Sequence, residues 1–165
     1  VEDPDPVMIF EHKLLYKTKG PVPEGFYTVP IGKAEVVREG RDLTIVATAI
    51  MVHKALDAAA ELAKEGIDVE VIDLRTVRPI DRETIIKSVK KTSKLLCVYE
   101  AVKTLGIGAE ISAIVAESDA FDYLDAPILT IAGKDVPMPY AANLEKLALP
   151  NVGEVVQAVK TVCYK

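Results

Sequence analysis

The chain has 165 residues, half of them apolar, and a formal net charge of −5. This length suits one domain with a sizeable core, and lysines and arginines scattered through an acidic chain argue against nucleic acid as a partner. The longest apolar run, 43–52, is too short to span a membrane, and no basic-then-apolar export signal opens the chain. We therefore expect a protein of the cytoplasm or the mitochondrial matrix, with no nucleic-acid or membrane partner.

The first 31 residues differ from the rest. Five of the ten prolines lie before residue 31, and proline removes backbone donors and fixes φ. Residues 7–10 are apolar enough to form a short strand, but little periodicity follows them. We expect residues 1–31 to be an arm or linker and residues 32–165 to form the folded domain.

From residue 32 onward, strand and helix patterns alternate. Apolar runs predict strands at 34–40, 43–49, 69–74, 95–101 and 127–133. Helical patterns occupy 51–64, a segment that Asp81 caps and Glu83 follows, 106–118, and a last helix from about Val152. Continuous Val, Ile and Leu strands separated by helices are typical of a sheet covered on both faces. The pattern predicts a three-layer α/β/α fold with a mixed, mostly parallel five-stranded sheet.

One strand should run against the others. The segment 34–40 leads into 43–49 through a Gly-Arg-Asp turn, which is too short for a parallel crossover. We therefore expect these two segments to pair with each other, the first as an antiparallel edge strand.

The glycine pair Gly106 and Gly108 raises the question of a phosphate-binding loop. A dinucleotide loop requires a third glycine where Ile111 stands. Glu110 would also place a negative charge beside a bound diphosphate. We interpret the pair as a tight turn. Cys97 and Cys163 lack the spacing of metal ligands or a redox dithiol, so we interpret them as buried thiols.

Polar side chains offer few candidates for catalysis. His53 and Asp57 are one helical turn apart, which favours a solvated helix pair over a catalytic dyad because no third group accompanies them. Charged residues at the expected carboxyl ends of strands could hold a small anion, or the arginines could pair with the acids to join loops, the interpretation we prefer. These residues are Arg75, Arg78, Glu100, Lys134 and Asp135.

Two helices have more apolar surface than a surface helix needs. The helix at 106–118 is apolar around most of its circumference, and the helix at 51–64 carries apolar residues beside its core stripe. Such helices lie either inside the domain or against another subunit. If a second subunit binds there, we expect it to contact Ile50, Met51, Ala58, Ile111, Ile114 and Val115.

Five segments in order carry a family resemblance: FEHKLLY, VIDLRTVRPIDRETI, YEAVKTLGIGAEISA, LDAPILTIAGKDVPMPYA and LPNVGEVVQAVKTV. Together they resemble the C-terminal half of the beta subunit of thiamine diphosphate-dependent 2-oxoacid dehydrogenases of the pyruvate and branched-chain type. The resemblance covers nearly the whole chain. It implies a transketolase C-terminal domain, an α/β fold whose five-stranded sheet has one antiparallel edge strand.

The resemblance also implies that catalysis and assembly belong to different parts of the enzyme. The glutamate that activates thiamine diphosphate belongs to the N-terminal half of such subunits, and the alpha subunit holds the diphosphate and its magnesium. We therefore expect no catalytic, cofactor or metal residues in this chain, and no activity from it alone. Its implied partners are a second copy, an alpha subunit and the acyltransferase docking domain, which would contact Asp125 and, less directly, Asp122.

Some residues depart from the family. Thr48, Ala49 and Ile50 replace the usual aromatic-glycine pair, and Tyr99 stands where many relatives have histidine. Two alternatives therefore stay open. One is a non-catalytic α/β building block, truncated or engineered, that forms oligomers without a ligand. The other is a sensor of small anions that uses Arg75 and Arg78.

Overall fold

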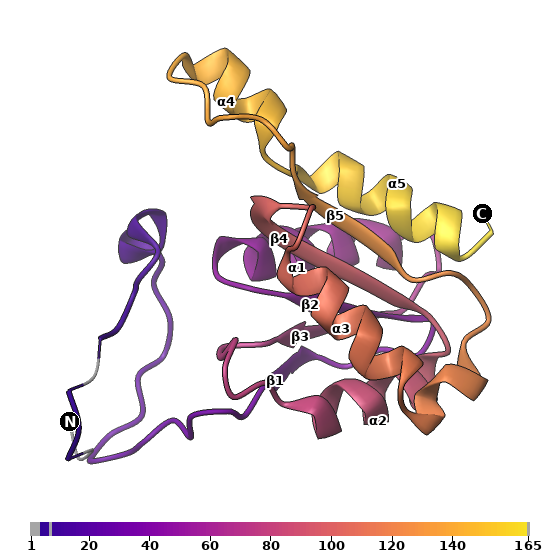
Figure 1. Ribbon diagram of the computed structural model, residues 1–165, viewed down its shortest axis with the longest axis horizontal. Coiled ribbons are helices and arrows are strands. Elements are labelled where there is room, and N and C mark those ends of the chain that lie inside the picture. The colour runs from indigo at the N-terminus through magenta and orange to yellow at the C-terminus, as the bar shows by residue number, and fades with distance from the viewer. Residues whose placement is uncertain (1–3, 7, 165) are drawn as a thin grey trace.

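The computed structural model describes residues 4–6 and 8–164, and Figure 1 shows its layers. The strands are β1 (Glu35–Arg38), β2 (Leu43–Ala47), β3 (Val69–Asp73), β4 (Leu95–Val102) and β5 (Leu129–Gly133). The α-helices are α1 (Ile50–Ala63), α2 (Arg82–Thr92), α3 (Ile107–Ala116), α4 (Ala142–Ala148) and α5 (Val152–Val162). Two 3-10 turns, η1 (Lys13–Lys17) and η2 (Asp119–Tyr123), complete the described elements.

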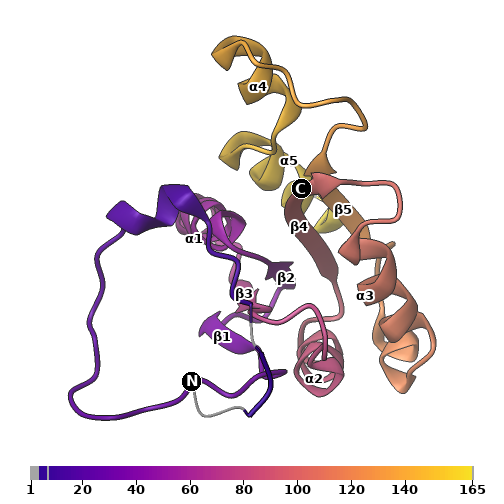
Figure 2. The same cartoon turned by 60° about the vertical axis from the view of Figure 1, so that its left-hand side comes forward.

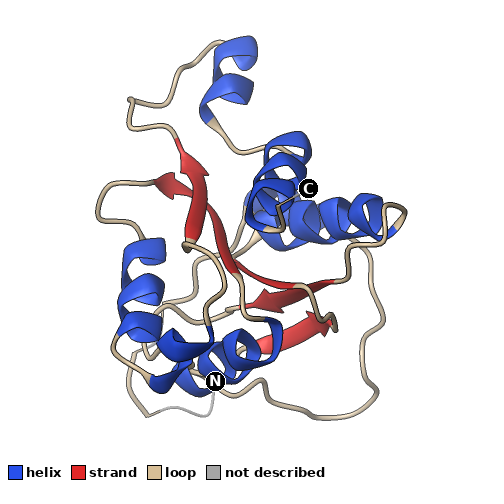
Figure 3. Cartoon of the chain, turned by 90° about the vertical axis from the view of Figure 1, so that its right-hand side faces the viewer, coloured by secondary structure: helices blue, strands red, loops and turns tan. Residues whose placement is uncertain are grey.

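The strands form one mixed sheet in the order β1-β3-β2-β4-β5. β2 runs parallel to β3 and β4, β4 runs parallel to β5, and β1 is the antiparallel edge strand beside β3. Helices α1 and α5 cover one face, whereas α2 and α3 cover the other, as the end-on view of Figure 3 shows. The predicted three-layer α/β/α class is confirmed.

The core consists of two apolar layers, one on each side of the sheet. Leu43, Ile45 and Val71 point to the α1 and α5 side. Val46 and Ile72, which alternate with them along the strands, point to the α2 and α3 side. Every residue of β2 is buried, as expected of a central strand in a sheet covered on both faces.

The predicted pairing of the first strand was wrong. β1 is antiparallel to β2 in direction, but β3 lies between them and forms the hydrogen bonds. The short connection instead crosses the start of β3, where the N–H groups of Arg41 and Asp42 donate to the Asp68 carbonyl, each at 2.9 Å. Gly40 permits this crossing, because a Cβ there would lie 2.2 Å from the Glu70 nitrogen.

Capping residues set the helix boundaries much as expected. The Asp81 side chain accepts a hydrogen bond from the Thr84 N–H at 3.2 Å and begins α2. Asn151 and Glu154 form a capping box at the start of α5. Gly66, at φ +77°, lies in the turn after α1, where a residue with a side chain would be strained.

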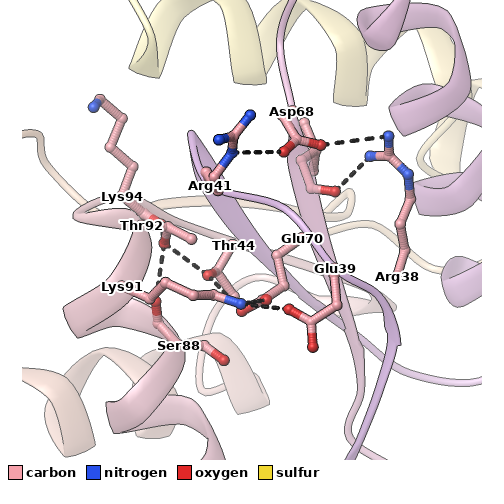
Figure 4. A network of polar contacts seen from close by, with 11 residues as sticks. Arg38, Glu39, Arg41, Thr44, Asp68, Glu70, Ser88, Lys91, Thr92 and Lys94 are labelled. Atoms are coloured by element: carbon pink, nitrogen blue, oxygen red, sulfur yellow. Dashed lines mark hydrogen bonds and ion pairs between the residues drawn. The ribbon is translucent and has the colours of Figure 1, made fainter.

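A buried polar network crosses the amino ends of the strands (Figure 4). Glu70 of β3 has no exposed surface, and its carboxylate pairs with Lys91 of α2. Lys91 also contacts Glu39 at 2.6 Å. The hydroxyls of Thr44 and Thr92, both buried, hydrogen-bond each other at 2.7 Å. This network fastens α2 to the sheet at the edge opposite the strands' carboxyl ends.

Two segments differ from the expectations. Val7 lies outside the described residues, and Met8, Ile9 and Phe10 form no strand but an exposed extended segment. Helix α4 was not predicted, and it stands apart from the three layers in Figures 1 and 2. Over the described part of the chain, no helix is long and apolar enough to cross a membrane.

Candidate functional site

The carboxyl ends of the parallel strands define the edge of the sheet where ligands bind in folds of this class. The chain leaves β2 through α1 to form β3 on one side, and leaves β3 through α2 to form β4 on the other side of β2. The strand order therefore reverses between β2 and β4. Thr48 and Ala49 after β2, and Glu100 near the end of β4, lie at this point.

The N-terminal arm lies against this edge, and Figure 2 shows η1 near α1. His12 Nε2 lies 2.8 Å from Glu100 Oε2, and these side chains are 22% and 27% exposed. The His12 Nδ1 atom is buried and has no hydrogen-bond partner among the described residues. This contact joins the arm to the body across 88 residues of sequence.

A cleft of about 1200 Å³ separates the arm from the body. The arm contributes His12 and Tyr16 to its lining, and the body contributes Val52, His53 and Thr76. A hydrogen bond to the Glu11 carboxylate, 2.8 Å away, raises the pKa of Tyr16 because it favours the neutral phenol. The cleft walls are therefore mixed in polarity, and the arm forms one of them.

Charges at the strand ends are largely neutralised within the chain. Arg75 pairs with Glu35, and its Nε lies 4.0 Å from Asp73 Oδ2. Burial raises the pKa of Asp73 although the Arg75 N–H and His53 oppose the shift. The preferred interpretation of Arg75 as a loop-joining residue agrees with these contacts, but its expected pairing with Glu100 was wrong, since Glu100 binds His12.

The other strand-end residues also join loops. Lys134 lies 3.7 Å from Glu154 of α5. Asp135 accepts hydrogen bonds from the Thr104 N–H and hydroxyl, which connects the loops after β4 and β5. Arg78 is exposed, and no ion pair to another described residue is found for it. These contacts leave little unpaired positive charge for an anion.

The turn before α3, which contains Gly106 and Gly108, leaves no room for larger side chains at either glycine. A Cβ on Gly106 would lie 2.4 Å from the Tyr99 hydroxyl oxygen, and one on Gly108 would lie 2.8 Å from the Tyr99 ring. Tyr99 is 3% exposed, and burial raises its pKa. The tyrosine thus fills the space beside both glycines, so the turn packs α3 closely against β4.

The histidine and acidic residues that the structure describes do not form a catalytic dyad or a metal site. His53 and Asp57 are exposed, and no hydrogen bond links them in the described structure. No group of three or more His, Cys, Asp or Glu side chains suited to a metal ion occurs among the described residues. Cys97 is fully buried, and burial raises the pKa of its thiol to about 12.

Five of the six proposed interface residues are buried within this chain: Met51, Ala58, Ile111, Ile114 and Val115. This placement corrects the expectation for those side chains, because atoms covered by the chain's own core have no surface left for a second subunit. Ile50, the sixth, is partly buried and packs against the same core. A second copy would have to contact other residues of α1 and α3.

The docking candidates, in contrast, lie on the surface. Asp125 is exposed, and its backbone is fixed because its N–H donates to the Ser93 carbonyl at 2.9 Å and its carbonyl accepts from the Tyr164 hydroxyl at 3.1 Å. Lys94 Nζ lies 3.8 Å from the Asp125 carboxylate. Asp122, in η2, is exposed as well.

A family model described as transketolase, C-terminal domain, matches residues 32–155. The chain belongs to this family. The resemblance drawn from the five sequence segments is thereby confirmed, and a five-stranded sheet with one antiparallel edge strand fits it.

The most similar relatives include beta subunits of the pyruvate dehydrogenase E1 component. That of Rhizobium meliloti is 58% identical over 166 residues, covering 100% of this chain and 36% of the relative. That of Rickettsia felis is 52% identical, covering 99% and 50%. The mitochondrial beta-1 subunit of Arabidopsis thaliana is 53% identical, covering 100% and 46%. The chain therefore spans half or less of the length of these relatives.

Solved structures agree on the fold. A split gene transketolase, described as an inactive beta4 tetramer, matches with a TM-score of 0.72 and 34% identity, covering 87% of this chain and 46% of that one. A 2-oxoglutarate:ferredoxin oxidoreductase from Magnetococcus marinus matches with a TM-score of 0.52 at 19% identity, which shows the fold alone.

Sequence patterns missed the partners that bring distant segments together. The bond between His12 and Glu100 joins residues whose spacing gives no periodic signal. Tyr99 could have been suspected, because two glycines follow an apolar strand in which it is the one large aromatic residue. Glu70 gave one signal, as a lone charge inside an apolar strand, and a buried partner is the usual requirement for such a residue.

Proposed function

We propose that this chain serves as the C-terminal part of the beta subunit in a thiamine diphosphate-dependent pyruvate dehydrogenase E1 component. The observation that carries the proposal is the 51–58% identity, over the whole chain, to beta subunits of that component. The reaction of the complete complex would be oxidative decarboxylation of pyruvate, with a branched-chain 2-oxoacid as the alternative substrate. Such an enzyme would work in the cytoplasm of a bacterium or in the mitochondrial matrix.

Within that enzyme we assign assembly and docking to these residues, and catalysis to others. The turn at Gly106 and Gly108 lacks the third glycine of a diphosphate loop, and Arg75 is already paired with Glu35, which supports this assignment. Thiamine diphosphate and magnesium would be held by the remaining part of a beta subunit and by an alpha subunit. The chain alone would then have no 2-oxoacid decarboxylase activity, and turnover by the purified chain would refute the assignment.

Docking is the first prediction to test. Asp125 is exposed and its backbone is held on both sides, so its carboxylate is a fixed target for an arginine of the acyltransferase docking domain. We expect Asp125→Lys to weaken binding of that domain by roughly tenfold to several hundredfold, because a charge pair becomes a repulsion. Isothermal titration calorimetry measures the change, and unchanged affinity would remove Asp125 from the docking site.

A self-assembled form is a second candidate function. The solved relative at 34% identity is described as an inactive beta4 tetramer, which supports an oligomer that forms without an alpha subunit. Light scattering on the chain alone and with an alpha subunit would separate the two functions. A molar mass that changes on mixing supports the role as an enzyme component. An oligomer whose mass is unchanged by the alpha subunit supports the building block.

A further inference from the structure

The two edges of the sheet are not alike. β1, one edge strand, has four residues, of which Glu35 and Arg38 are charged, and its register with β3 shifts between Val36 and Arg38. Short length, charged residues and irregular pairing are features by which proteins keep an edge strand from pairing with another chain. β5, the opposite edge, has the sequence LTIAG over 129–133, without a charged residue or a proline. The second edge therefore lacks the usual protection.

The outer side of β5 keeps its backbone groups available. β5 pairs with β4 alone, and four of its five residues are partly exposed. In the described part of the chain, no hydrogen bond joins the backbone of 129–133 to a group outside the sheet. Lys134 ends this free stretch, since its N–H donates to the Ala148 carbonyl at 2.9 Å. An unpaired row of N–H and C=O groups is a template for a further strand.

The side chains of β5 are engaged on the two faces of the sheet, so only the edge remains open. Leu129 and Ile131 pack against the core on the α1 and α5 side. Ala132 packs against the core on the other side. Thr130 lies against Gly108 of α3, where an added Cβ would be 3.0 Å from its hydroxyl oxygen. A strand held in this way is preorganised, which lowers the entropic cost of adding a neighbour.

A hollow of about 500 Å³ lies beside this edge, between β5 and α5. Charged side chains of both signs line it in equal number: Lys103, Lys134, Asp135 and Glu154. The lining therefore carries no net charge, although the chain as a whole carries −5. Two copies of the chain meet no net repulsion at this surface, and the lysines of each can face the acids of the other.

We propose that β5 pairs with β5 of a second copy, antiparallel across a twofold axis, so that two five-stranded sheets join into one. A twofold axis perpendicular to the sheet lets the same edge serve both partners. The outward N–H and C=O groups of each strand then bond those of the other. The inference rests on the proposed function in one respect, because it supplies the contact for the self-assembled form.

The observations favour a second copy over an extended peptide of another protein. A free peptide would lose its flexibility on binding, whereas β5 of a second copy is already a fixed strand of matching spacing. The balanced charge of the hollow selects neither an acidic nor a basic segment. Pro127, which has no N–H, limits the pairing to the residues that follow it.

Hydrogen exchange tests the pairing directly. The amides of 129–133 that point away from β4 exchange fast at a free edge and slowly in a joined sheet. Their protection should rise by roughly tenfold or more as the chain concentration passes through the dissociation constant of the dimer, found by analytical ultracentrifugation. The outward amides of β1 are the internal control and should not change. A chain that stays monomeric at about 1 mM overturns the inference, and so does protection of 129–133 that is absent from the dimer or already complete in the monomer.

Substitutions on α5 provide a second test. Gln157 and Thr161 are exposed and line the hollow, so Gln157→Lys and Thr161→Lys each place bulk and an unbalanced charge where the second copy lies. Each should raise the dissociation constant of the dimer by roughly tenfold or more. Ala60→Lys, with the same change of charge at an exposed position of α1 outside the hollow, is the matched control and should leave it unchanged. Equal effects of all three, in variants with a folded circular dichroism spectrum, would overturn the inference.

Binding of an alpha subunit, measured on the same samples, separates this inference from the proposed function. If an alpha subunit binds and no dimer forms through β5, the inference is overturned and the proposed function stands. If 129–133 become protected in a dimer that binds no alpha subunit, the role as an enzyme component fails and the inference stands.

Discussion

Glu70 is a carboxylate without exposed surface, so it requires a cationic partner besides the neutral Thr44 hydroxyl, which lies 3.5 Å from its Oε1. Lys91 supplies that partner, and although burial would lower the pKa of Lys91, its hydrogen bonds to Glu39 and Glu70 raise it. Lys91→Met keeps the length of the side chain but leaves the Glu70 charge buried and unpaired. We expect the free energy of unfolding, measured in urea, to fall by about 3–5 kcal/mol.

Two comparisons separate this pair from ordinary surface charge. Lys87, an exposed residue of the same helix, should tolerate replacement by Met within about 0.5 kcal/mol. Adding Glu70→Gln to Lys91→Met should restore a good part of the loss, because the unpaired charge is removed. If Lys91→Met proves as mild as the Lys87 variant, Glu70 is neutral or hydrated in the folded protein.

Asp81 gives the chain a measurable dependence on pH. Burial raises the pKa of this carboxyl, but the N–H groups of Ala34 and Thr84, the Thr84 hydroxyl and Lys33 outweigh it and hold the pKa below its usual range. A lowered pKa in the folded state means that the carboxylate stabilises the protein above its unfolded pKa, and that this stabilisation is lost as the pH falls through the folded pKa.

Asp81→Asn should therefore lower stability by about 1 kcal/mol at neutral pH. The variant keeps a capping oxygen but loses the charge. The gap to wild type should close between about pH 5 and pH 2, which urea unfolding at several pH values would show. A gap that stays constant on acidification would mean that Asp81 has the same pKa in both states.

Sequence patterns predicted residues whose role is local and missed those whose role is distant. Asp81 was predicted as a cap because capping depends on the next three residues. The partner of Glu100 was not, because His12 is 88 residues away and no spacing rule connects them. Glu70 and Lys91 are likewise 21 residues apart, on different elements, so only the fold brings them together.

At the scale of elements, the position of α3 depends on its close packing against β4. Gly106 has an ordinary φ of −77°, so an alanine there would not strain the backbone. Its Cβ would, however, lie 2.6 Å from the Val102 carbonyl oxygen as well as against Tyr99. We expect Gly106→Ala to destabilise the domain by about 1–3 kcal/mol through overpacking, measured as a lowered thermal midpoint.

Gly20→Ala is the control for this change. Gly20 lies in the arm, and nothing stands within 4 Å of the place where its Cβ would be. Its replacement should leave the midpoint unchanged. An equally small effect at Gly106 would show that α3 can move away from Tyr99 without cost, and the glycine turn would then need another explanation.

Elements with a strong hydrophobic period could be predicted from the sequence, whereas the elements that lie beside them could not. The apolar strands and α1, α2, α3 and α5 were recognised, whereas α4, with seven residues and no buried stripe, gave no signal. The apolar circumference of α3 left two explanations open, and its contacts with the sheet and with η2 favour burial inside the domain. The connection 39–42 predicted an antiparallel strand correctly but could not reveal that β3 lies between the pair.

At the scale of the whole molecule, the sequence pattern predicted the fold class but could not predict the order of the strands in the sheet. Parallel and antiparallel directions follow from connection lengths, but the order of the strands depends on which helix covers which face. The apolar hollow of about 610 Å³ beside Asp122 is a similar case, because it combines α3, η2 and the segment before β5. Such surfaces emerge only when the layers are assembled.

Cys97 makes the stability of the assembled sheet measurable. It lies in β4, between β2 and β5, has no exposed surface, and its thiol pKa of about 12 leaves almost no thiolate at neutral pH. A thiol reagent should therefore reach it only when the sheet opens globally. In a Cys163→Ser background, the labelling rate of Cys97 should equal the population of the open chain multiplied by the reagent's intrinsic rate. Lys91→Met, if it costs about 3 kcal/mol, should then accelerate labelling by about 150-fold, since 1.36 kcal/mol corresponds to a factor of ten. Labelling that is fast in wild type and insensitive to Lys91→Met would mean that β4 opens locally, and that the sheet is not a single cooperative unit.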